Sequence, residues 1–306
     1  MTNSIRIGFL SSRATPTPAR PDPNAEAFRQ GLRDLGYIEG YNILVEYRYA
    51  EAQEDRIPSL MADLVQRQVD ILVSPSIAAI LAAKQATTTI PIVMVTNVDP
   101  IATGIVASLA RPGGNITGLT RLNQDLSGKR LELLKEAVPT LARVGVLVDA
   151  DYAEADKAFQ EYEAAAQALK ITLHLVEVRS ATPDFEGAFH AAVQEGVRAL
   201  LTVRTGLLIT HRHQIATLAI KHRLPSMAEG SDFVEAGGLM SYAASDAESF
   251  KRAAYYVDKI LQGTKTSELP IEQPTKFELL INRTTAQVLG LTIPPALLFQ
   301  ADRVIP

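Results

Sequence analysis

Cysteine is absent from this sequence of 306 residues. Disulfide bonds and thiolate chemistry are therefore excluded. Long apolar runs are absent as well, because no stretch reaches the roughly 18 uninterrupted apolar residues that a membrane-spanning helix needs. The best candidate, Ile71 to Ala83, is interrupted by Ser74, Pro75 and Ser76. With 47% hydrophobic and 21% charged residues, the composition is that of a globular protein.

A large excess of charge of either sign is also missing. The formal net charge is −4, which gives no electrostatic reason to expect a nucleic acid or an anionic membrane as a partner. No basic and apolar leader precedes the strand that we predict to begin at Ile5. Two locations therefore stay open: the periplasm, with the leader removed, and the cytoplasm.

Motifs for catalysis and cofactor binding are missing too. The sequence has no glycine-rich loop followed by Lys-Ser/Thr, no dinucleotide spacing G-x-G-x-x-G and no G-x-S-x-G elbow. His211 and His213 are two residues apart, which would place them on different sides of a helix, and no third metal ligand is evident. We therefore expect no metal, no cofactor and no enzymatic activity.

What is present is an alternation of short β-rich runs with helix-length periodic segments. A second series of strands follows the first at similar offsets, with matching starts at 5 and 144, 43 and 171, 71 and 199, and 92 and 225. This predicts an α/β fold of two Rossmann-like lobes, each with a parallel sheet covered by helices on both faces. The alternative is one long doubly wound sheet, which is disfavoured because so many parallel strands in one sheet would be unusual.

In parallel α/β sheets, ligands bind beyond the carboxyl ends of the strands. Two such lobes facing each other make a cleft, which is a favoured place for small molecules. The candidate ligand-binding residues therefore follow the predicted strands: Ser11, Ser12, Arg13, Ser74, Pro75, Ser76, Thr96 and Asn97 in the first lobe, and Asp149, Tyr152, Arg204, Thr205, Glu229 and Tyr242 in the second.

Four of these residues also fit structural roles. Arg204 fits a surface salt bridge nearly as well as a ligand contact, and Glu229 fits a helix cap as well as a site acid. Tyr242 fits either stacking on a ligand or packing at the joint. Arg13 belongs to the stretch SSRATPTPARPDP, which is longer than a usual βα loop and fits either a lid or a disordered surface.

The stretch RPGGNITGLT, residues 111–120, contains residues with unusual backbone freedom at the point where we expect the first lobe to end. Gly113 and Gly114 can adopt positive φ, and Asn115 tolerates the left-handed region. These three residues are our candidate hinge. A rigid turn at the crossover is an equally good interpretation.

Several stretches together carry a family resemblance. The most specific is DPIATGIVASLARPGGNITG, and LPIEQPTKFELLIN supports it. EAFRQGLRDLGYIEGYNILVEYRYAE, ADLVQRQVDILV, RVGVLV and LPSMAEGSDFVEAGGLMSYAAS extend it over nearly the whole chain. The sequence resembles the tryptophan/tyrosine-type substrate-binding proteins of ABC transporters, which have a type I periplasmic-binding fold.

This resemblance implies a bilobed protein whose chain crosses between lobes three times, with a ligand cleft between them. The first lobe would comprise residues 1–119 and 245–268, and the second would comprise residues 120–244 and 269–306. Such a protein performs no catalysis. It is expected to be a monomer that delivers a small organic molecule to a membrane permease.

Two departures from the family pattern bear on the ligand. Ile77 stands where the family usually has Ser or Thr at the start of a helix, so Ser74 or Ser76 supplies the hydroxyl or the pocket is more apolar. Arg204 stands where amino-acid-binding members often offer an Asp for the ammonium group. A guanidinium grips a carboxylate instead, which suggests an organic acid without a free amine.

Two other classes of function are alternatives. A ligand-sensing regulator would need a DNA-binding segment ahead of the first strand, and only four residues precede Ile5. A two-lobe α/β enzyme would need a nucleophile, a metal cluster or a nucleotide loop, and the sequence offers none of these.

Overall fold

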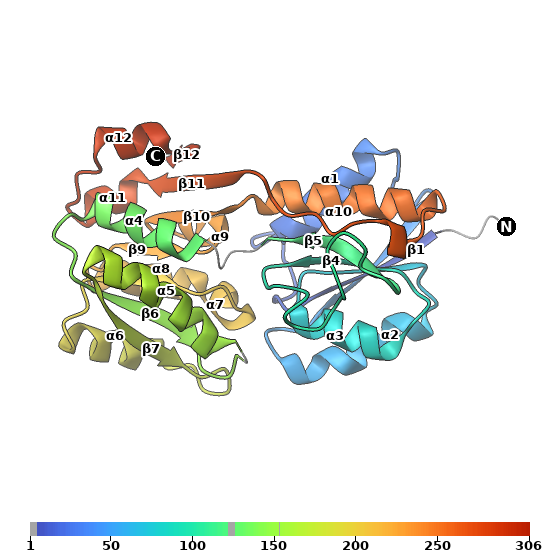
Figure 1. Ribbon diagram of the computed structural model, residues 1–306, viewed down its shortest axis with the longest axis horizontal. Coiled ribbons are helices and arrows are strands. Elements are labelled where there is room, and N and C mark those ends of the chain that lie inside the picture. Colours follow the sequence, from blue (N-terminus) through green and yellow to red (C-terminus); the bar gives the residue numbers. More distant parts are fainter. Residues whose placement is uncertain (1–4, 122–125, 153) are drawn as a thin grey trace. The chain divides into compact units, whose positions relative to one another are not determined.

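The computed structural model describes residues 5–121, 126–152 and 154–306, which form two compact α/β units (Figure 1). Unit 1 comprises Met1–Leu122 and Ser245–Thr275. Unit 2 comprises Asn123–Ala244 and Lys276–Pro306. Each unit is therefore assembled from two separate segments, and the chain passes between units three times.

Two of these boundaries lie later in the chain than the sequence suggested. They follow residues 122 and 275, where 119 and 268 were expected. The segment after 268 stays with unit 1 because it bonds to the edge of that unit's sheet. The Ile271 N–H donates to Leu109 O at 2.8 Å, and the Thr120 N–H donates to Glu272 O at 2.9 Å.

The sheet of unit 1 is parallel throughout, in the order β2-β1-β3-β4-β5. Strands β1, β3 and β4 are mainly buried apolar runs, as is typical of a sheet covered on both faces, whereas the edge strand β2 is largely half-buried and carries Glu46 and Arg48. The strands are β1 (Ile5–Ser11), β2 (Ile43–Tyr49), β3 (Ile71–Ser74), β4 (Ile92–Thr96) and β5 (Ile116–Thr120).

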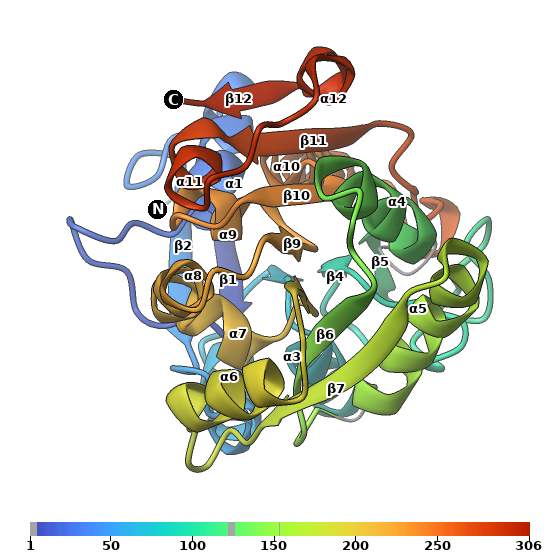
Figure 2. The same cartoon turned by 90° about the vertical axis from the view of Figure 1, so that its left-hand side faces the viewer.

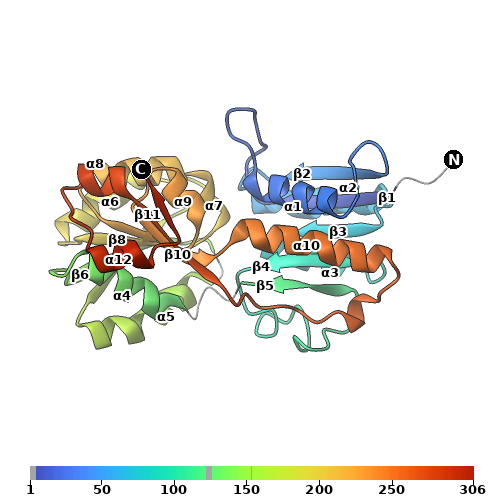
Figure 3. The same cartoon turned by 90° about the horizontal axis from the view of Figure 1, so that it is seen from above.

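Helices cover both faces of this sheet: α1 (Pro23–Asp34) and α10 (Asp246–Leu261) on one, α2 (Ile57–Gln66) and α3 (Ile77–Ala86) on the other. Helices α1 and α10 run side by side although they are far apart in the sequence (Figure 3). Gly31 permits this approach, because a Cβ there would lie 2.9 Å from both Lys251 Cα and Ala254 Cβ. Phe28 and Phe250 complete the core below them.

The stretch RPGGNITGLT does not end the first lobe, as its sequence suggested, because residues 116–120 form β5 and pair with β4. Gly113 and Gly114 do have positive φ, +70° and +62°. Asn115 does not adopt that conformation. Its side-chain Nδ2 instead donates to Ile90 O at 2.8 Å and Thr87 O at 3.2 Å. The three residues therefore form a turn inside unit 1, ahead of the crossing after residue 122.

The sheet of unit 2 has the order β12-β11-β10-β9-β8-β6-β7. Its strands are parallel except that β11 runs antiparallel to β10. The expected fully parallel sheet is therefore corrected at two strands, because β12 is parallel to β11 and so also runs opposite to the other five. The strands are β6 (Arg143–Asp149), β7 (Thr172–Val178), β8 (Ala199–Thr202), β9 (Ser226–Ala228), β10 (Met240–Ala244), β11 (Phe277–Asn282) and β12 (Arg303–Ile305).

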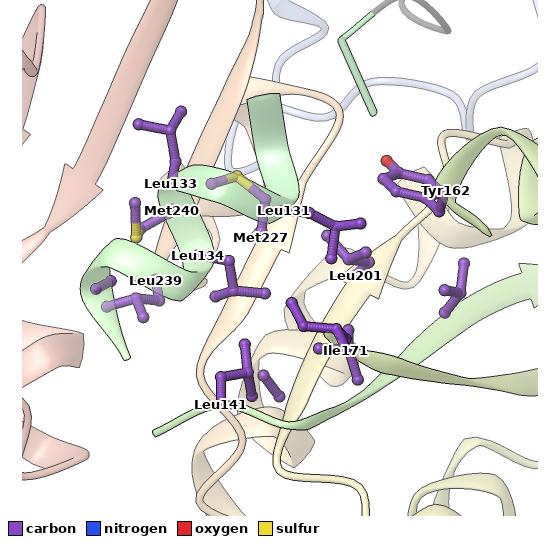
Figure 4. Close-up of a cluster of buried hydrophobic side chains, with 14 of the residues drawn as sticks. Leu131, Leu133, Leu134, Leu141, Tyr162, Ile171, Leu201, Met227, Leu239 and Met240 are labelled. Carbon is purple, nitrogen blue, oxygen red and sulfur yellow. The ribbon is translucent and has the colours of Figure 1, made fainter. Parts of the chain in front are cut away.

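Helices also cover both faces of this second sheet (Figure 2). One face carries α4 (Ser127–Ala137) and α5 (Ala155–Leu169), whose apolar side chains meet Leu201, Met227 and Met240 of the strands (Figure 4). The other face carries α6 (Phe185–Gln194), α7 (Gly206–Thr210) and α8 (Arg212–Lys221). Three short helices complete the unit: α9 (Ser231–Glu235), α11 (Arg283–Val288) and α12 (Pro295–Gln300).

Helices α7 and α8 divide at His211. The Thr205 hydroxyl caps α7 by accepting from the Leu208 N–H. In the described part of the chain, no helix has both the length and the apolar character that a membrane crossing requires.

Candidate functional site

Hydroxyl side chains at the carboxyl edge of the unit 1 sheet mainly shape their own loops. Ser11 Oγ accepts from the Arg13 N–H at 3.2 Å, and Thr96 Oγ1 accepts from the Val98 N–H at 3.3 Å. Ser74 Oγ donates to Leu10 O at 2.7 Å. The buried hydroxyls of this edge thus fix the loop backbones that carry Ser12, Pro75 and Asn97.

Ser76 takes the N-cap position of α3. Its Oγ accepts from the Ala79 N–H at 3.4 Å, and its own N–H donates to Ser74 Oγ at 3.2 Å. Both hydroxyls that were considered as substitutes at the Ile77 position therefore make local bonds. Their contact with a ligand stays a prediction.

Arg13 is buried beside an acid rather than spread on the surface. Its Nη1 lies 3.9 Å from Asp22 Oδ1, and both side chains are less than 10% exposed. Asp22 also caps α1 by accepting from the Asn24 N–H at 3.1 Å. Burial, followed by the negative charge of Asp22, raises the pKa of Tyr49 well above its ordinary value. The Arg13 charge is thus held at the carboxyl edge of β1 and β2.

The loop that carries Arg13 is fastened to the loop after β2. The Ala52 N–H donates to Ser12 O at 2.8 Å, and the Glu51 N–H donates to Arg13 O at 3.1 Å. Glu51 and Ala52 both have positive φ, +56° and +58°. Such backbone costs about 1–3 kcal/mol per residue and is typically retained at functional sites. The disordered surface considered for the Arg13 stretch is therefore replaced, at its beginning, by a loop that is hydrogen-bonded to the strained backbone of residues 51–52.

Glu229 is the centre of a buried network at the carboxyl edge of the unit 2 sheet. Its Oε1 accepts from Tyr162 OH at 2.8 Å and from Arg130 Nη1 at 3.2 Å. Its Oε2 accepts from the backbone N–H of Arg204 at 3.0 Å. The Arg130 side chain is fully buried. Each of these donors offsets part of the hydration that the buried carboxylate loses.

Tyr162 is held protonated by this environment. Burial raises the pKa of its phenol far above the ordinary value, and the adjacent Glu229 charge raises it further. The phenol therefore acts as a hydrogen-bond donor to the carboxylate.

Arg204 lies beside a second acid, Asp232 of α9. The distance from Nη2 to Asp232 Oδ2 is 3.4 Å, with side chains only 6% and 9% exposed. The guanidinium lies over Gly230, where a Cβ would be 2.0 Å from Nη1. The surface salt bridge considered for Arg204 is thus corrected to a buried ion pair.

A hollow opens where β8 and β9 end, between helices α7, α8 and α9 of unit 2. The charged residues that line it are Arg204, Arg212, Glu229 and Asp232. Apolar walls come from side chains such as Leu208, Ile215 and Phe233. Charged and apolar side chains thus meet around a small hollow of about 20 Å³ at this edge of the sheet.

Asp149 is the last residue of β6 and lies at the same edge. Its carboxylate accepts from Ser180 Oγ at 2.9 and 3.0 Å and from the Asp151 N–H at 3.1 Å. Burial nevertheless raises the pKa of Asp149, because desolvation outweighs these hydrogen bonds. Tyr152 lies in the turn that follows and bonds back through its N–H to Asp149 O at 3.0 Å.

Replacing Ser180 by Ala should raise the pKa of Asp149 further, since a donor to the charged form is lost. The native state already binds more protons than the unfolded state between the ordinary and the raised pKa, so stability falls as pH rises through that window. We expect this fall to grow by about 1 kcal/mol.

Carboxyl-carbon NMR titration and urea unfolding at several pH values would measure both effects. Ser59→Ala is the control, because Ser59 Oγ donates only to a carbonyl, Arg56 O, among its described hydrogen bonds. An unchanged Asp149 pKa in the Ser180 variant would contradict this account.

Tyr242 of β10 is mainly a packing residue in unit 2. Its ring centroid lies 6.1 Å from that of Phe277, and its side chain packs against the apolar core. Its carbonyl oxygen accepts from Arg130 Nε at 2.9 Å. Whether its hydroxyl meets a ligand stays a prediction.

Three further candidate functional residues were not indicated by any pattern in the sequence: Arg130, Tyr162 and Asp232. Arg130 shares the buried face of α4 with Leu131, Leu134 and Ala137. A charged residue within an apolar helical stripe was the available signal for a buried polar contact. Within residues 5–121, 126–152 and 154–306, no three His, Asp or Glu side chains are grouped so as to hold a metal ion.

Comparisons with known proteins agree on one type of protein. A family model described as ABC transporter substrate binding protein matches residues 19–305. The chain is 25% identical over 271 residues to a tyrosine-binding protein of Clostridioides difficile, covering 88% of this chain and 77% of that one.

Solved structures with the same fold include two that match over almost the full length. One is a conserved domain protein from Vibrio cholerae, with a TM-score of 0.87 and 26% identity, covering 99% of this chain and 100% of that one. The other is an ABC domain from Streptococcus pneumonia in complex with L-Trp, with a TM-score of 0.86, 22% identity and the same coverage. The second likeness bears on the fold alone.

Proposed function

This chain belongs to the family of ABC transporter substrate-binding proteins and has their type I periplasmic-binding fold, and we propose that it captures an aromatic amino acid or another small carboxylate for an ABC importer. The observation that carries this proposal is the buried Arg204 beside the hollow at the carboxyl ends of β8 and β9. A guanidinium in such a place is suited to a carboxylate.

The relatives support the proposed ligand class. One is named a tyrosine-binding protein, and one solved structure holds L-Trp. Residues Arg13 in unit 1 and Arg204 in unit 2 each offer a guanidinium at the carboxyl edge of their own sheet. We propose that both edges contribute ligand contacts and that ligand binding favours a closed state of the protein.

The partner in this proposal is a membrane permease, and the protein acts as a monomer outside the cytoplasm, in the periplasm. The permease receives the ligand unchanged. A ligand-sensing regulator and a two-lobe enzyme are the alternatives, and consumption of the ligand separates the enzyme from the other two.

A thermal-shift screen tests the function. We expect an amino acid or an aromatic acid in the panel to raise Tm by several degrees, because a ligand at about 100 times its Kd stabilises the native state by about 2.7 kcal/mol. NMR of the mixture over several hours should show the ligand intact. Absence of any shift across amino acids and organic acids, or conversion of the ligand, would refute the proposal.

A further inference from the structure

The chain passes between the units at three places, and the second crossing joins a strand directly to a helix. Strand β10 ends at Ala244, which is paired with Phe277 of β11 inside unit 2. The next residue, Ser245, already belongs to α10 of unit 1. Its Oγ accepts from the Glu248 N–H at 3.4 Å, and its carbonyl oxygen accepts from the Ser249 N–H at 3.1 Å. This crossing can therefore bend only through the backbone torsions at Ala244 and Ser245.

The third crossing follows a segment that is fastened to unit 1, residues 269–272, which we call the strap. Its backbone pairs with the edge of the sheet. The Glu272 N–H donates to Gly118 O at 3.1 Å, and the Thr120 N–H donates to Glu272 O at 2.9 Å. The strap therefore lies along β5. Residues 273–276, which belong to neither helix nor strand, join it to β11 of unit 2.

Helix α10 also holds the strap. Arg252 of α10 makes two bonds to Glu272, from Nε to Oε2 at 2.8 Å and from Nη2 to Oε1 at 2.6 Å. The guanidinium carbon lies 3.8 Å from the centroid of the Tyr255 ring, and Tyr256 OH donates to Pro270 O at 2.5 Å. A two-pronged contact with a carboxylate is the best geometry for an arginine ion pair, and stacking on an aromatic ring supports it. These contacts set the point where the strap ends.

The first crossing is held by the same helix. Arg121 is the last described residue ahead of this crossing, and its guanidinium forms an ion pair with Asp246, the first residue of α10. The two side chains are only 4% and 12% exposed. Salt screens such a pair much less than it screens a pair on the surface. Helix α10 thus binds the chain beside all three crossings.

We propose that α10 is the fixed base of a hinge between the units. In the second and third crossings, bending is confined to the Ala244–Ser245 junction and to residues 273–276. The ion pair of Arg252 with Glu272 keeps the second of these segments short. It thereby restrains the motion of the units, because the span of a flexible segment grows with the square root of its length. This rests on the proposed function, in which a ligand favours a closed state, and adds what limits that motion.

This hinge differs from the one that the sequence suggested. Gly113, Gly114 and Asn115 form a turn that is bonded to other parts of unit 1: Gly114 O accepts from Thr266 Oγ1 at 2.8 Å, and Asn115 Nδ2 donates to Ile90 O. Their unusual backbone conformation shapes this turn. Hinge residues need not be glycine, and composition gave no signal at the crossings themselves.

Distances between two labels test the hinge without any ligand. The chain has no cysteine, so Ile101→Cys in unit 1 and Phe299→Cys in unit 2 provide unique sites for nitroxide labels. Both native side chains are exposed, at 45% and 93%. Pulsed electron paramagnetic resonance then gives the distribution of distances between the units. Glu272→Arg, Arg252→Glu and the combined charge exchange are compared in this background.

Each single charge variant places like charges side by side, so the strap should detach from α10. Freeing residues 271 and 272 extends the flexible segment from 273–276 to 271–276, which should broaden the distance distribution by about 1.2-fold. The charge exchange, Arg252→Glu with Glu272→Arg, should reverse at least about half of this broadening, because the pair forms again with opposite polarity.

Glu235→Arg is the matched control. Glu235 forms an exposed ion pair with Arg303 at 3.4 Å inside unit 2. Its charge reversal therefore creates the same kind of repulsion away from the strap, and the distribution should keep its wild-type width. Circular dichroism and Tm of each variant establish that it is folded.

Three outcomes overturn the hinge assignment. The first is a wild-type width in both single charge variants. The second is a broadening that the charge exchange leaves unchanged, and the third is an equal broadening in the Glu235→Arg control. None of these results bears on ligand capture, which the thermal-shift panel tests separately. Conversely, a panel without any binder would refute the function and leave the measured hinge in place.

Discussion

Arg130→Met lowers the free energy of unfolding by about 3–5 kcal/mol, because it leaves the buried Glu229 carboxylate without its cation. The variant also removes the donor to Tyr242 O on β10. Methionine is a good helix former, so α4 itself should persist. Urea unfolding followed by circular dichroism measures the loss.

Lys129→Met is the matched control. Lys129 precedes Arg130 on α4, its side chain is 44% exposed, and it pairs with Glu132 at 3.5 Å. Its replacement should change stability by less than about 0.5 kcal/mol. Adding Glu229→Gln to Arg130→Met should restore part of the loss, since no buried charge is then left uncompensated. If Arg130→Met and Lys129→Met had equal free energies of unfolding, the network around Glu229 would contribute little to stability.

Gly118→Ala costs about 4 kcal/mol or more, or prevents folding. Gly118 of β5 has a φ of +129°, and a Cβ there would lie 2.1 Å from Met94 O. The added carbon meets backbone atoms that cannot move without breaking the pairing of β5 with β4. Yield of folded protein and urea unfolding measure the effect.

Gly128→Ala is a control of opposite sign. Gly128 lies in α4, and a Cβ there would have its nearest neighbour at 3.5 Å, an ordinary contact with Ala165 Cβ. Alanine at this helical position should stabilise the protein by up to about 1 kcal/mol. If both alanine variants behaved alike, the conformation described for Gly118 would be wrong.

The repeated α/β layout was predictable because buried parallel strands are nearly continuous apolar runs. Ile92–Thr96 and Arg143–Asp149 are examples in which every residue, or all but the first, is buried. Strand β5 was missed because its sequence, ITGLT, contains a glycine and two threonines and follows a glycine turn. Its burial comes from neighbours that only the folded sheet supplies.

The candidate site was predictable in position but not in detail. Parallel topology places Arg204 and Glu229 together at strand ends, as expected. The partners of Glu229 lie 67 and 99 residues away on α5 and α4, at Tyr162 and Arg130. No local pattern encodes such distances. Asp232 lies closer in sequence, but its contact with Arg204 depends on Gly230, where a Cβ would collide with the Arg204 guanidinium.

The division of each unit between two chain segments has a consequence for biosynthesis. Phe28 lies against α10, whose Phe250 belongs to the same apolar cluster, so the first lobe stays unfinished on the ribosome until most of the polypeptide has been made. The second lobe waits for β11 and β12 near the carboxyl terminus. Nascent chains usually fold one domain after another from the amino terminus. Here both lobes can reach completion only near the end of translation, so truncated products would expose apolar surface of both.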